Sequence, residues 1–286
     1  MSEAAARKLW LSLEALHDVV YFAPGVRDAG MALGLRGFWM TYFAFRAAPM
    51  GPVGPEVVIA TFAGFKPAMV EKAIPEAWTR VAPEACVEAR SRFSADALRD
   101  AGVDAEACAA ANARLSPVTT TADRTGRPLF TANAAVPIPD DPIAALWQYT
   151  STLREHRGDG HIAALVTAGL TGLQAHLLQV AAGRHAAEEI RSARGWDKQE
   201  WARAAAQLQG RGLLTRETTP RLTPAGHALL ADIENRTDQL AWTGALAPLG
   251  EEGVDEIVEL LRPSVRALWD SGVLPDVNPT GLPKPL

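Results

Sequence analysis

Residues 204–240, AAAQLQGRGLLTRETTPRLTPAGHALLADIENRTDQL, carry the strongest fold signal in the chain. Gly212 is suited to end the helix before it, because glycine readily takes the left-handed conformation that often follows a helix C-terminus. The two leucines after it predict a short buried strand, and Leu222 lies on the return strand. Thr223 can cap the next helix, with Pro224 in its first turn. The predicted order is therefore helix, short β-hairpin and helix.

This order resembles winged-helix proteins of the MarR type, in which RGLL (211–214) would end a helix before the wing and LTPAGHALL (222–230) would open the helix after it. The whole chain also resembles an actinobacterial family of unassigned activity. In that family a helical N-terminal half, with a stretch such as LHDVVYFAPGVRDAGMALGLRGFWMTYFAFRAAPMGPVGPEV (16–57), precedes the winged helix and the segment REHRGDGH (154–161). The two resemblances imply an architecture but no particular chemistry.

Apolar residues recur at helical spacing through much of the remaining chain. They predict helices over residues 4–22, 26–48, 83–115, 142–154, 161–182 and 253–269. A Pro-rich stretch interrupts this pattern, so we predict a helical domain at 1–115, a connection at 116–140 and a winged-helix domain at 141–286. The fold class is then mainly α, with the helical N-terminal domain packed on a MarR-like winged helix-turn-helix domain that carries a small β-wing.

Composition and charge narrow the class of protein. Of 286 residues, 48% are hydrophobic and 21% charged, as in ordinary globular chains. The formal net charge of -5 gives no overall basic field for nucleic acid. Two cysteines do not make a disulfide framework, which favours a reducing, cytoplasmic location. The uncharged run at 161–183 contains glutamines, a histidine and glycines, so it predicts a buried helix and not a membrane span.

In the regulators that the chain resembles, the second helix of the helix-turn-helix enters the major groove of DNA. Here that helix spans about 197–209, and the span 191–221 holds seven basic and three acidic residues, a local excess of four positive charges. The candidate DNA-binding residues are Lys198, Gln199 and Arg203 on the helix and Arg216 and Arg221 on the wing. The wing has few basic residues, so a winged helix kept only as a packing scaffold remains an alternative.

Aromatic and basic residues are concentrated in the N-terminal half. His17 and Tyr21 share a helix face, and Trp39, Tyr42, Phe43 and Arg46 recur at helical spacing with Arg36 nearby. Aromatic walls with a few basic groups suit a planar, anionic ligand, such as a tetrapyrrole or an aromatic metabolite, bound between the two halves. The alternative is an ordinary aromatic core in which Arg46 or Arg36 pairs with a nearby acid.

The segment TLREHRGDGHIAAL (152–165) places polar groups around a Gly-Asp-Gly motif. One interpretation is a helix end followed by a new helix that Asp159 caps. A second adds His156, Arg157, Asp159 and His161 to the ligand pocket. A third is a metal site or an enzyme that uses His17, His156 and His161. The glycine loops and nucleophile motifs of common enzyme classes do not occur in the sequence, which leaves enzymatic activity undecided.

We therefore predict a small-molecule-binding winged-helix protein, acting as a ligand-responsive transcriptional regulator. The alternative is an enzyme or metal-binding protein built on a winged helix that no longer binds DNA. Regulators of the resembled type dimerise, so a homodimer is also expected.

Overall fold

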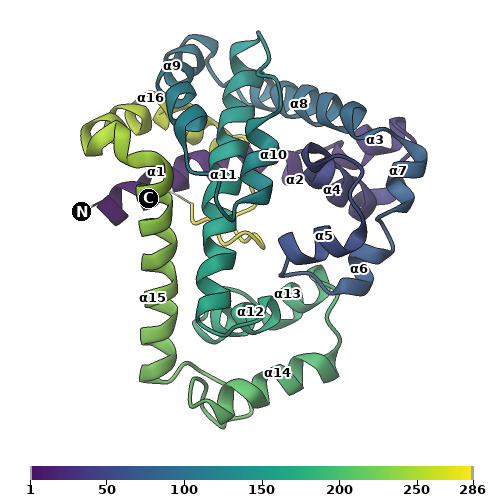
Figure 1. Cartoon of the computed structure of the whole chain (residues 1–286), viewed down its shortest axis with the longest axis vertical. Helices are drawn as coiled ribbons and strands as arrows, with labels where there is room; N and C mark the ends of the chain where they lie inside the picture. Colours follow the sequence, from purple (N-terminus) through teal and green to yellow (C-terminus); the bar gives the residue numbers. More distant parts are fainter. Residues whose placement is uncertain (1, 285–286) are drawn as a thin grey trace.

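The computed structural model describes residues 2–284 and consists of helices joined by short connections (Figure 1). In chain order these are α1 (Ser2–His17), α2 (Val19–Phe22), α3 (Val26–Ala32), α4 (Gly37–Ala47), η1 (Ala48–Met50), α5 (Pro55–Thr61), α6 (Pro67–Glu71), α7 (Glu76–Arg80), α8 (Pro83–Asp100), α9 (Ala105–Thr121), α10 (Pro128–Ala134), α11 (Pro142–Thr167), α12 (Gly172–Ala181), α13 (Ala187–Ala193), α14 (Lys198–Gly210), α15 (Pro224–Ala241), η2 (Trp242–Leu246), η3 (Ala247–Leu249) and α16 (Gly250–Asp270). The predicted mainly α-helical class is confirmed.

Helix α11 lies at the centre of the molecule and packs against α1, α8, α9, α10 and α15 (Figure 1). Its start follows the sequence prediction, because the Asp141 carboxylate accepts a hydrogen bond from the Ala144 amide and Pro142 occupies the first turn. Within residues 2–284, no single helix has the length and apolar character needed to cross a membrane. Helices α11 and α12 meet that criterion only as a pair, and the chain bends by 92° between them.

The predicted break at the Gly-Asp-Gly segment is wrong, because α11 continues through it. A Cβ at Gly160 would lie 2.9 Å from Nη1 of Arg127 and 3.4 Å from the Cβ of Leu240, so the missing side chain allows close packing. Asp159 does not cap a new helix. Its carboxylate accepts a 2.9 Å hydrogen bond from the Phe130 amide in the first turn of α10. These residues therefore join neighbouring helices and form no turn.

The apolar residues form two separate clusters. The larger contains side chains from α1–α10, the first half of α11, the end of α15, η2 and α16. The smaller contains Ala164, Leu165, Leu170, Leu173, Leu177, Leu178, Ala204, Leu208, Leu213, Leu214, Leu222, Leu230 and Ile233. Helix α11 contributes to both clusters and so connects them.

The Pro-rich residues 116–140 contain the end of α9 and all of α10. The division into domains at 1–115 and 141–286 stays a prediction.

The predicted single helix over 26–48 is two helices, α3 and α4. Gly34 separates them with a φ of +92°, a left-handed conformation that glycine adopts without strain. A Cβ at Gly30 would clash with the Thr41 side chain, since its distance from Oγ1 would be 1.9 Å. The glycines in this segment therefore serve a tight turn and the close approach of α3 to α4.

The ends of the helices around the predicted wing follow the sequence. Gly212 has a φ of +71° just after α14, and the Thr223 hydroxyl accepts a hydrogen bond from the Gly226 amide at the start of α15. Between them, within residues 2–284, no strand forms; Leu214 and Leu222 face each other in one antiparallel bridge. The predicted β-wing is thus reduced to a loop held by a single bridge.

Candidate functional site

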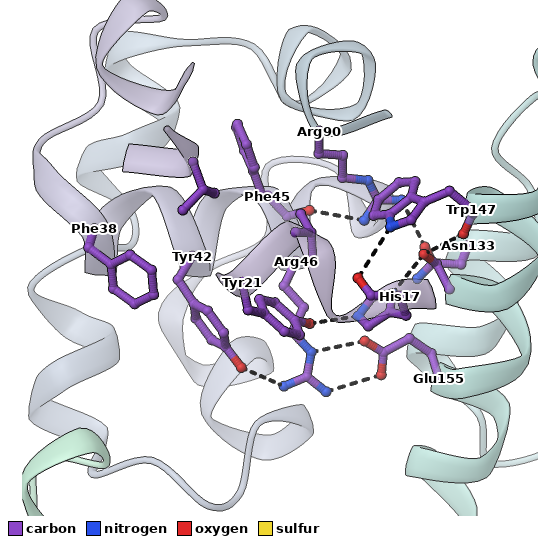
Figure 2. A pocket seen from close by; sticks show the side chains of 13 residues that line it. His17, Tyr21, Phe38, Tyr42, Phe45, Arg46, Arg90, Asn133, Trp147 and Glu155 are labelled. Atoms are coloured by element: carbon purple, nitrogen blue, oxygen red, sulfur yellow. Dashed lines mark hydrogen bonds and ion pairs between the residues drawn. The ribbon is translucent and has the colours of Figure 1, made fainter. Parts of the chain in front are cut away.

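A small cavity lies where the N-terminal helices meet α11 (Figure 2). Its lining residues are His17, Val20, Tyr21, Val26, Phe38, Tyr42, Phe45, Arg46, Arg90, Asn133, Trp147, Ser151 and Glu155. Its volume is about 10 Å³, which is room for about one water molecule. Five of the thirteen lining residues are Phe, Tyr or Trp, and charged groups from α4, α8 and α11 reach the cavity.

Arg46 and Glu155 join α4 to α11 through two parallel hydrogen bonds. Nε of Arg46 lies 2.9 Å from Oε1 of Glu155, and a terminal nitrogen lies 3.0 Å from Oε2 (Figure 2). The guanidinium also lies 4.2 Å from the centre of the Phe62 ring and 3.4 Å from the Tyr42 hydroxyl. A bidentate arginine–carboxylate pair fixes both side chains, so this contact holds α4 against α11.

A second arginine extends this buried cluster. Arg154 lies 3.1 Å from Glu155 and 3.3 Å from Glu14 on α1. Burial by itself would raise the pKa of Glu155, but the positive charges of Arg46 and Arg154 outweigh that effect and hold the pKa well below its ordinary value. Glu155 is therefore ionised, and the two arginines share two carboxylates.

The His17 ring bridges α1, α2 and α11. The Ser151 hydroxyl donates to the carbonyl oxygen of Trp147, so it accepts the 2.8 Å hydrogen bond from Nδ1–H of His17. Nε2 then accepts from the Tyr21 hydroxyl at 2.9 Å. Burial, followed by the charge of Arg154, lowers the pKa of His17 well below its ordinary value. His17 is thus neutral at physiological pH, with its proton on Nδ1.

Arg90 on α8 is buried at the edge of the cavity and is only 4% exposed. It donates to the Phe45 carbonyl at 3.0 Å, to the Asn133 side chain at 2.8 Å and to the Gln148 side chain at 3.4 Å. Its Nε has no hydrogen-bond partner, and no carboxylate of residues 2–284 forms an ion pair with it. Burial lowers the pKa of Arg90 to about 10, which still leaves it positively charged at neutral pH.

Four of the predicted ligand residues line the cavity: His17, Tyr21, Tyr42 and Arg46. Three others from the same region lie elsewhere. Arg36 is exposed and pairs with Glu76, whereas Trp39 and Phe43 pack with Phe65. The stripe of aromatic residues therefore contributes partly to the cavity and partly to the core.

The remaining predicted ligand residues on α11 have separate partners. His156 packs on Phe130, Arg157 pairs with Asp238, and His161 bonds to the hydroxyl of Thr237. Asp159, as described above, accepts from a backbone amide of α10. No group of three potential metal ligands occurs within residues 2–284. The structure does not bring His17, His156 and His161 together, so it lends no support to the enzyme or metal-binding alternative.

Some residues that line the cavity are not among the predicted ligand residues. They are Arg90, Asn133, Trp147, Ser151 and Glu155, together with the apolar side chains of Val20, Val26, Phe38 and Phe45. Arg90 follows buried Cys86 by four residues and precedes buried Leu98 by eight. That spacing places it on the apolar stripe of a helix, which is the signal that indicates its burial.

Helix α14 presents a second candidate surface. Ala204 and Leu208 are buried in the smaller apolar cluster, whereas Lys198, Gln199 and Arg203 are exposed. Asp197 caps the helix by accepting from the amides of residues 199 and 200 at 3.0 and 2.8 Å. The helix therefore turns one face to the core and a polar face to solvent.

The loop after α14 adds two exposed arginines, Arg216 and Arg221. Together with Lys198 and Arg203 they form no ion pair within residues 2–284. All five residues predicted for DNA binding are thus on the surface. The positive charges of the four basic residues among them are not neutralised by a paired acid, so these charges are available to bind an anion from outside the chain.

A contact from the N-terminal half reaches the start of α14. Nζ of Lys66 lies 3.0 Å from Asp197 and 2.7 Å from Glu200. Beside it, the Lys66 amide donates to the carbonyl of Arg194, and the Trp196 indole donates to the carbonyl of Gly64. The connection between α5 and α6 is therefore bonded directly to the turn between α13 and α14.

Comparison with known proteins gives one match. The model of a helix-turn-helix family matches residues 6–275, which is nearly the whole chain. No curated protein and no solved structure matches the chain significantly.

Proposed function

Since the chain belongs to this helix-turn-helix family, we propose that it is a DNA-binding transcriptional regulator with a MarR-like winged helix formed by α12–α15 and the loop at 213–222. The observation that carries this proposal is the exposed polar face of α14. It supplies two cations and glutamines on a helix whose other face is anchored in an apolar core.

The residue types on this face suit recognition of the major groove. Arg203 can donate two hydrogen bonds to a guanine, and Gln199 can bond to an adenine. Lys198 at the first turn of the helix is suited to a backbone phosphate. Arg216 and Arg221 on the adjacent loop extend the positive surface toward the neighbouring groove or backbone. The reduced wing makes α14 the main source of sequence recognition.

Binding to the DNA that flanks the protein's own gene tests this proposal. We expect Arg203→Ala to weaken binding about 5- to 150-fold, because a good arginine–guanine contact is worth about 1–3 kcal/mol. Arg92→Ala is the matched control, because it removes an exposed arginine from α8, at the opposite end of the molecule from α14 (Figure 1). Affinity should also fall steeply with salt. Equal loss in both variants would argue against α14 as the DNA-binding helix.

Small-molecule binding in the cavity is the second part of the proposal. It is supported by the convergence of His17, Tyr21, Tyr42 and Arg46 on one space. A volume of about 10 Å³ is far too small for a tetrapyrrole, so the ligand that suits this site is a small one. Phe38 and Tyr42 are only half-buried, and rotation of their side chains would enlarge the space.

Two physical links would couple the cavity to α14. Helix α11 carries Ser151 and Glu155 in the cavity and continues to Leu165 in the apolar cluster beneath α14. The Lys66 contact connects the N-terminal half to the first turn of α14. A ligand that shifts α11 or the connection between α5 and α6 would therefore bias the position of α14.

A homodimer belongs to the same proposal, because regulators of the resembled type bind two half-sites of DNA. The length of DNA protected from cleavage, together with the mass of the protein in solution, tests it. A monomer that protects a single half-site would contradict it.

A further inference from the structure

The segment that follows α16 folds back onto the rest of the protein. Leu274, Asn278 and Leu282 are only 3–4% exposed, so this segment is packed in place. It passes between the N-terminal helices and α12–α13 (Figure 1). Residues 274–282 are called the strap below.

The strap is bonded to both halves of the molecule. The Thr280 hydroxyl lies 2.8 Å from Oδ2 of Asp18, in the turn between α1 and α2. The Pro279 carbonyl accepts a 3.2 Å hydrogen bond from Arg194, which directly follows α13. The strap therefore joins the junction of α1 and α2 to the turn before α14.

The bonds of Asn278 determine where the hydrogen of the Thr280 hydroxyl points. The side-chain nitrogen of Asn278 donates to the carbonyls of Pro275 and Leu282, and its Oδ1 accepts from the Leu282 amide. Oδ1 is thus fixed as an acceptor, and it lies 2.6 Å from the Thr280 hydroxyl. Since a hydroxyl has a single hydrogen, Thr280 donates to Asn278 and can only accept at Asp18.

The bond between Thr280 and Asp18 therefore needs a hydrogen on Asp18. An ionised carboxylate only accepts hydrogen bonds, whereas a carboxylic acid has one O–H donor. Asp18 is fully buried, and its Oδ1 has no hydrogen-bond partner. A buried orphan oxygen is less costly on a neutral carboxylic acid than on a charged carboxylate. The geometry thus favours a protonated Asp18 beneath the docked strap.

We propose that the strap is a proton-dependent latch, which docks on the neutral carboxyl of Asp18 and is released when that carboxyl ionises. Ionisation would place two acceptors against each other unless Thr280 gave up its bond to Asn278, so one hydrogen bond is lost in either case. Release would also remove the contact between Pro279 and Arg194 beside the turn before α14. This device goes beyond the proposed function, because it depends neither on DNA nor on the cavity.

The groups around Asp18 act on its protonation in opposite directions. Burial raises the pKa of Asp18 well above its ordinary value, and the carboxylate of Glu14 on α1 raises it further. Arg154 on α11 and Arg194 after α13 lower it. A released strap would leave Asp18 open to water, where its pKa is lower, so the docked form takes up a proton. Between the two pKa values, docking weakens by up to about tenfold for each unit of pH.

A second titratable group touches the strap and has to be separated from Asp18. A Cβ at Gly281 would lie 3.3 Å from Nε2 of His185. Burial lowers the pKa of His185 below its ordinary value, so this ring stays neutral above about pH 6.5. Measurements from about pH 6.5 to about pH 9 therefore leave Asp18 as the group on which the strap depends.

A spin label on the strap measures its release. Val277 is 66% exposed, and Cys86 and Cys108 are buried, so Val277→Cys takes up a nitroxide label at one place. Electron paramagnetic resonance of the full chain should show a restricted label at about pH 6.5 and a growing mobile component toward pH 9. A signal that stays constant, or that becomes more restricted as pH rises, would overturn the proposal.

Three substitutions in the labelled protein identify the titrating group. Asp18→Asn keeps a neutral donor opposite Thr280, so its label should stay restricted at every pH. Thr280→Val keeps the shape but loses the hydroxyl, and its label should be mobile already at about pH 6.5. Asp276→Asn, which removes an exposed acid close to Asn278, is the control and should respond to pH like the unmodified protein.

Two results of these variants would refute the latch: a pH response that persists in Asp18→Asn, and a restricted label in Thr280→Val. All of these spectra are recorded without DNA, so they stand or fall separately from the DNA-binding test of Arg203→Ala.

Discussion

The middle of helix α11, around Glu155, and its C-terminal end, around Leu165, lie in different environments, and we call them its charged end and its leucine-rich end. Near Glu155 the surrounding arginines and carboxylates are buried and paired with one another, and the helices are joined by charged hydrogen bonds. Near Leu165 the core is formed by leucine and alanine side chains, and the basic residues of α14 and its loop are exposed and unpaired. Charge therefore joins the helices in the first region, whereas in the second region the charged side chains lie on the surface.

The largest expected effect of a single substitution is at the charged end. Glu155→Gln leaves Arg46 and Arg154 buried without enough negative charge, which should cost about 3–5 kcal/mol of unfolding free energy. Urea denaturation measures this loss. Asp232→Asn, which breaks the exposed pair with Arg236, is the control and should cause no measurable change. A loss for Glu155→Gln as small as that of the control would mean that the buried pair does not hold the helices together.

A double variant sharpens this result. Replacing both members of the ion pair, as Arg46→Met with Glu155→Leu, removes the positive and the negative charge together, so neither is left buried without the other. It should be less destabilising than Glu155→Gln alone, since apolar residues of similar volume can replace a buried ion pair. Additive losses would show that the two groups act independently.

Sequence reasoning succeeded best at the ends of helices, both at the start of α11 and in the leucine-rich region. The caps at Asp141 and Thr223 and the C-terminal Gly212 are confirmed, because each depends on the bonding preferences of a few adjacent residues. The helix-turn-helix class expected from residues 204–240 is confirmed by the family match over residues 6–275, and its MarR-like form stays a prediction. The predicted strands of the β-wing are wrong, because the loop between α14 and α15 is held by one antiparallel bridge between Leu214 and Leu222.

The charged end could be predicted only in part. The predicted proximity of His17 and Tyr21 is confirmed, although the predicted helix over 4–22 is divided and the two residues lie in α1 and α2. Arg46 and Glu155 are 109 positions apart, and nothing local pairs them. Arg90 was missed because a charged residue in an alanine-rich helix is usually exposed. Its burial is indicated only by its spacing from the apolar residues on the same face of the helix.

Acid should lower the free energy of unfolding over a predictable range of pH. Burial lowers the pKa values of His17, His156 and His176, the last two to about 3, so the unfolded chain binds protons that the folded chain does not. Their stabilisation is present above pH 6.5 and is lost as pH falls toward 3. Asp159 and Asp18 oppose this effect, because burial raises the pKa of Asp159 to about 6 and that of Asp18 well above its ordinary value, but the three histidines outnumber the two acids. The urea midpoint should fall between pH 7 and 5; a constant midpoint would contradict this assignment.

The smallest effect is expected at the leucine-rich end, for Thr223→Ala. The Thr223 hydroxyl accepts from the Gly226 amide and donates to the Gly212 carbonyl, so it joins the end of α14 to the start of α15. Loss of an N-cap costs about 1 kcal/mol, because one amide of the first turn loses its partner. Thr223→Ser keeps the hydroxyl and should restore most of the urea midpoint. Because Thr223 lies beside the loop at 213–222, which belongs to the proposed DNA-binding surface, its loss should also weaken DNA binding. A loss of stability for Thr223→Ala as large as that for Glu155→Gln would show that the two regions of α11 do not differ in how their charges stabilise the fold.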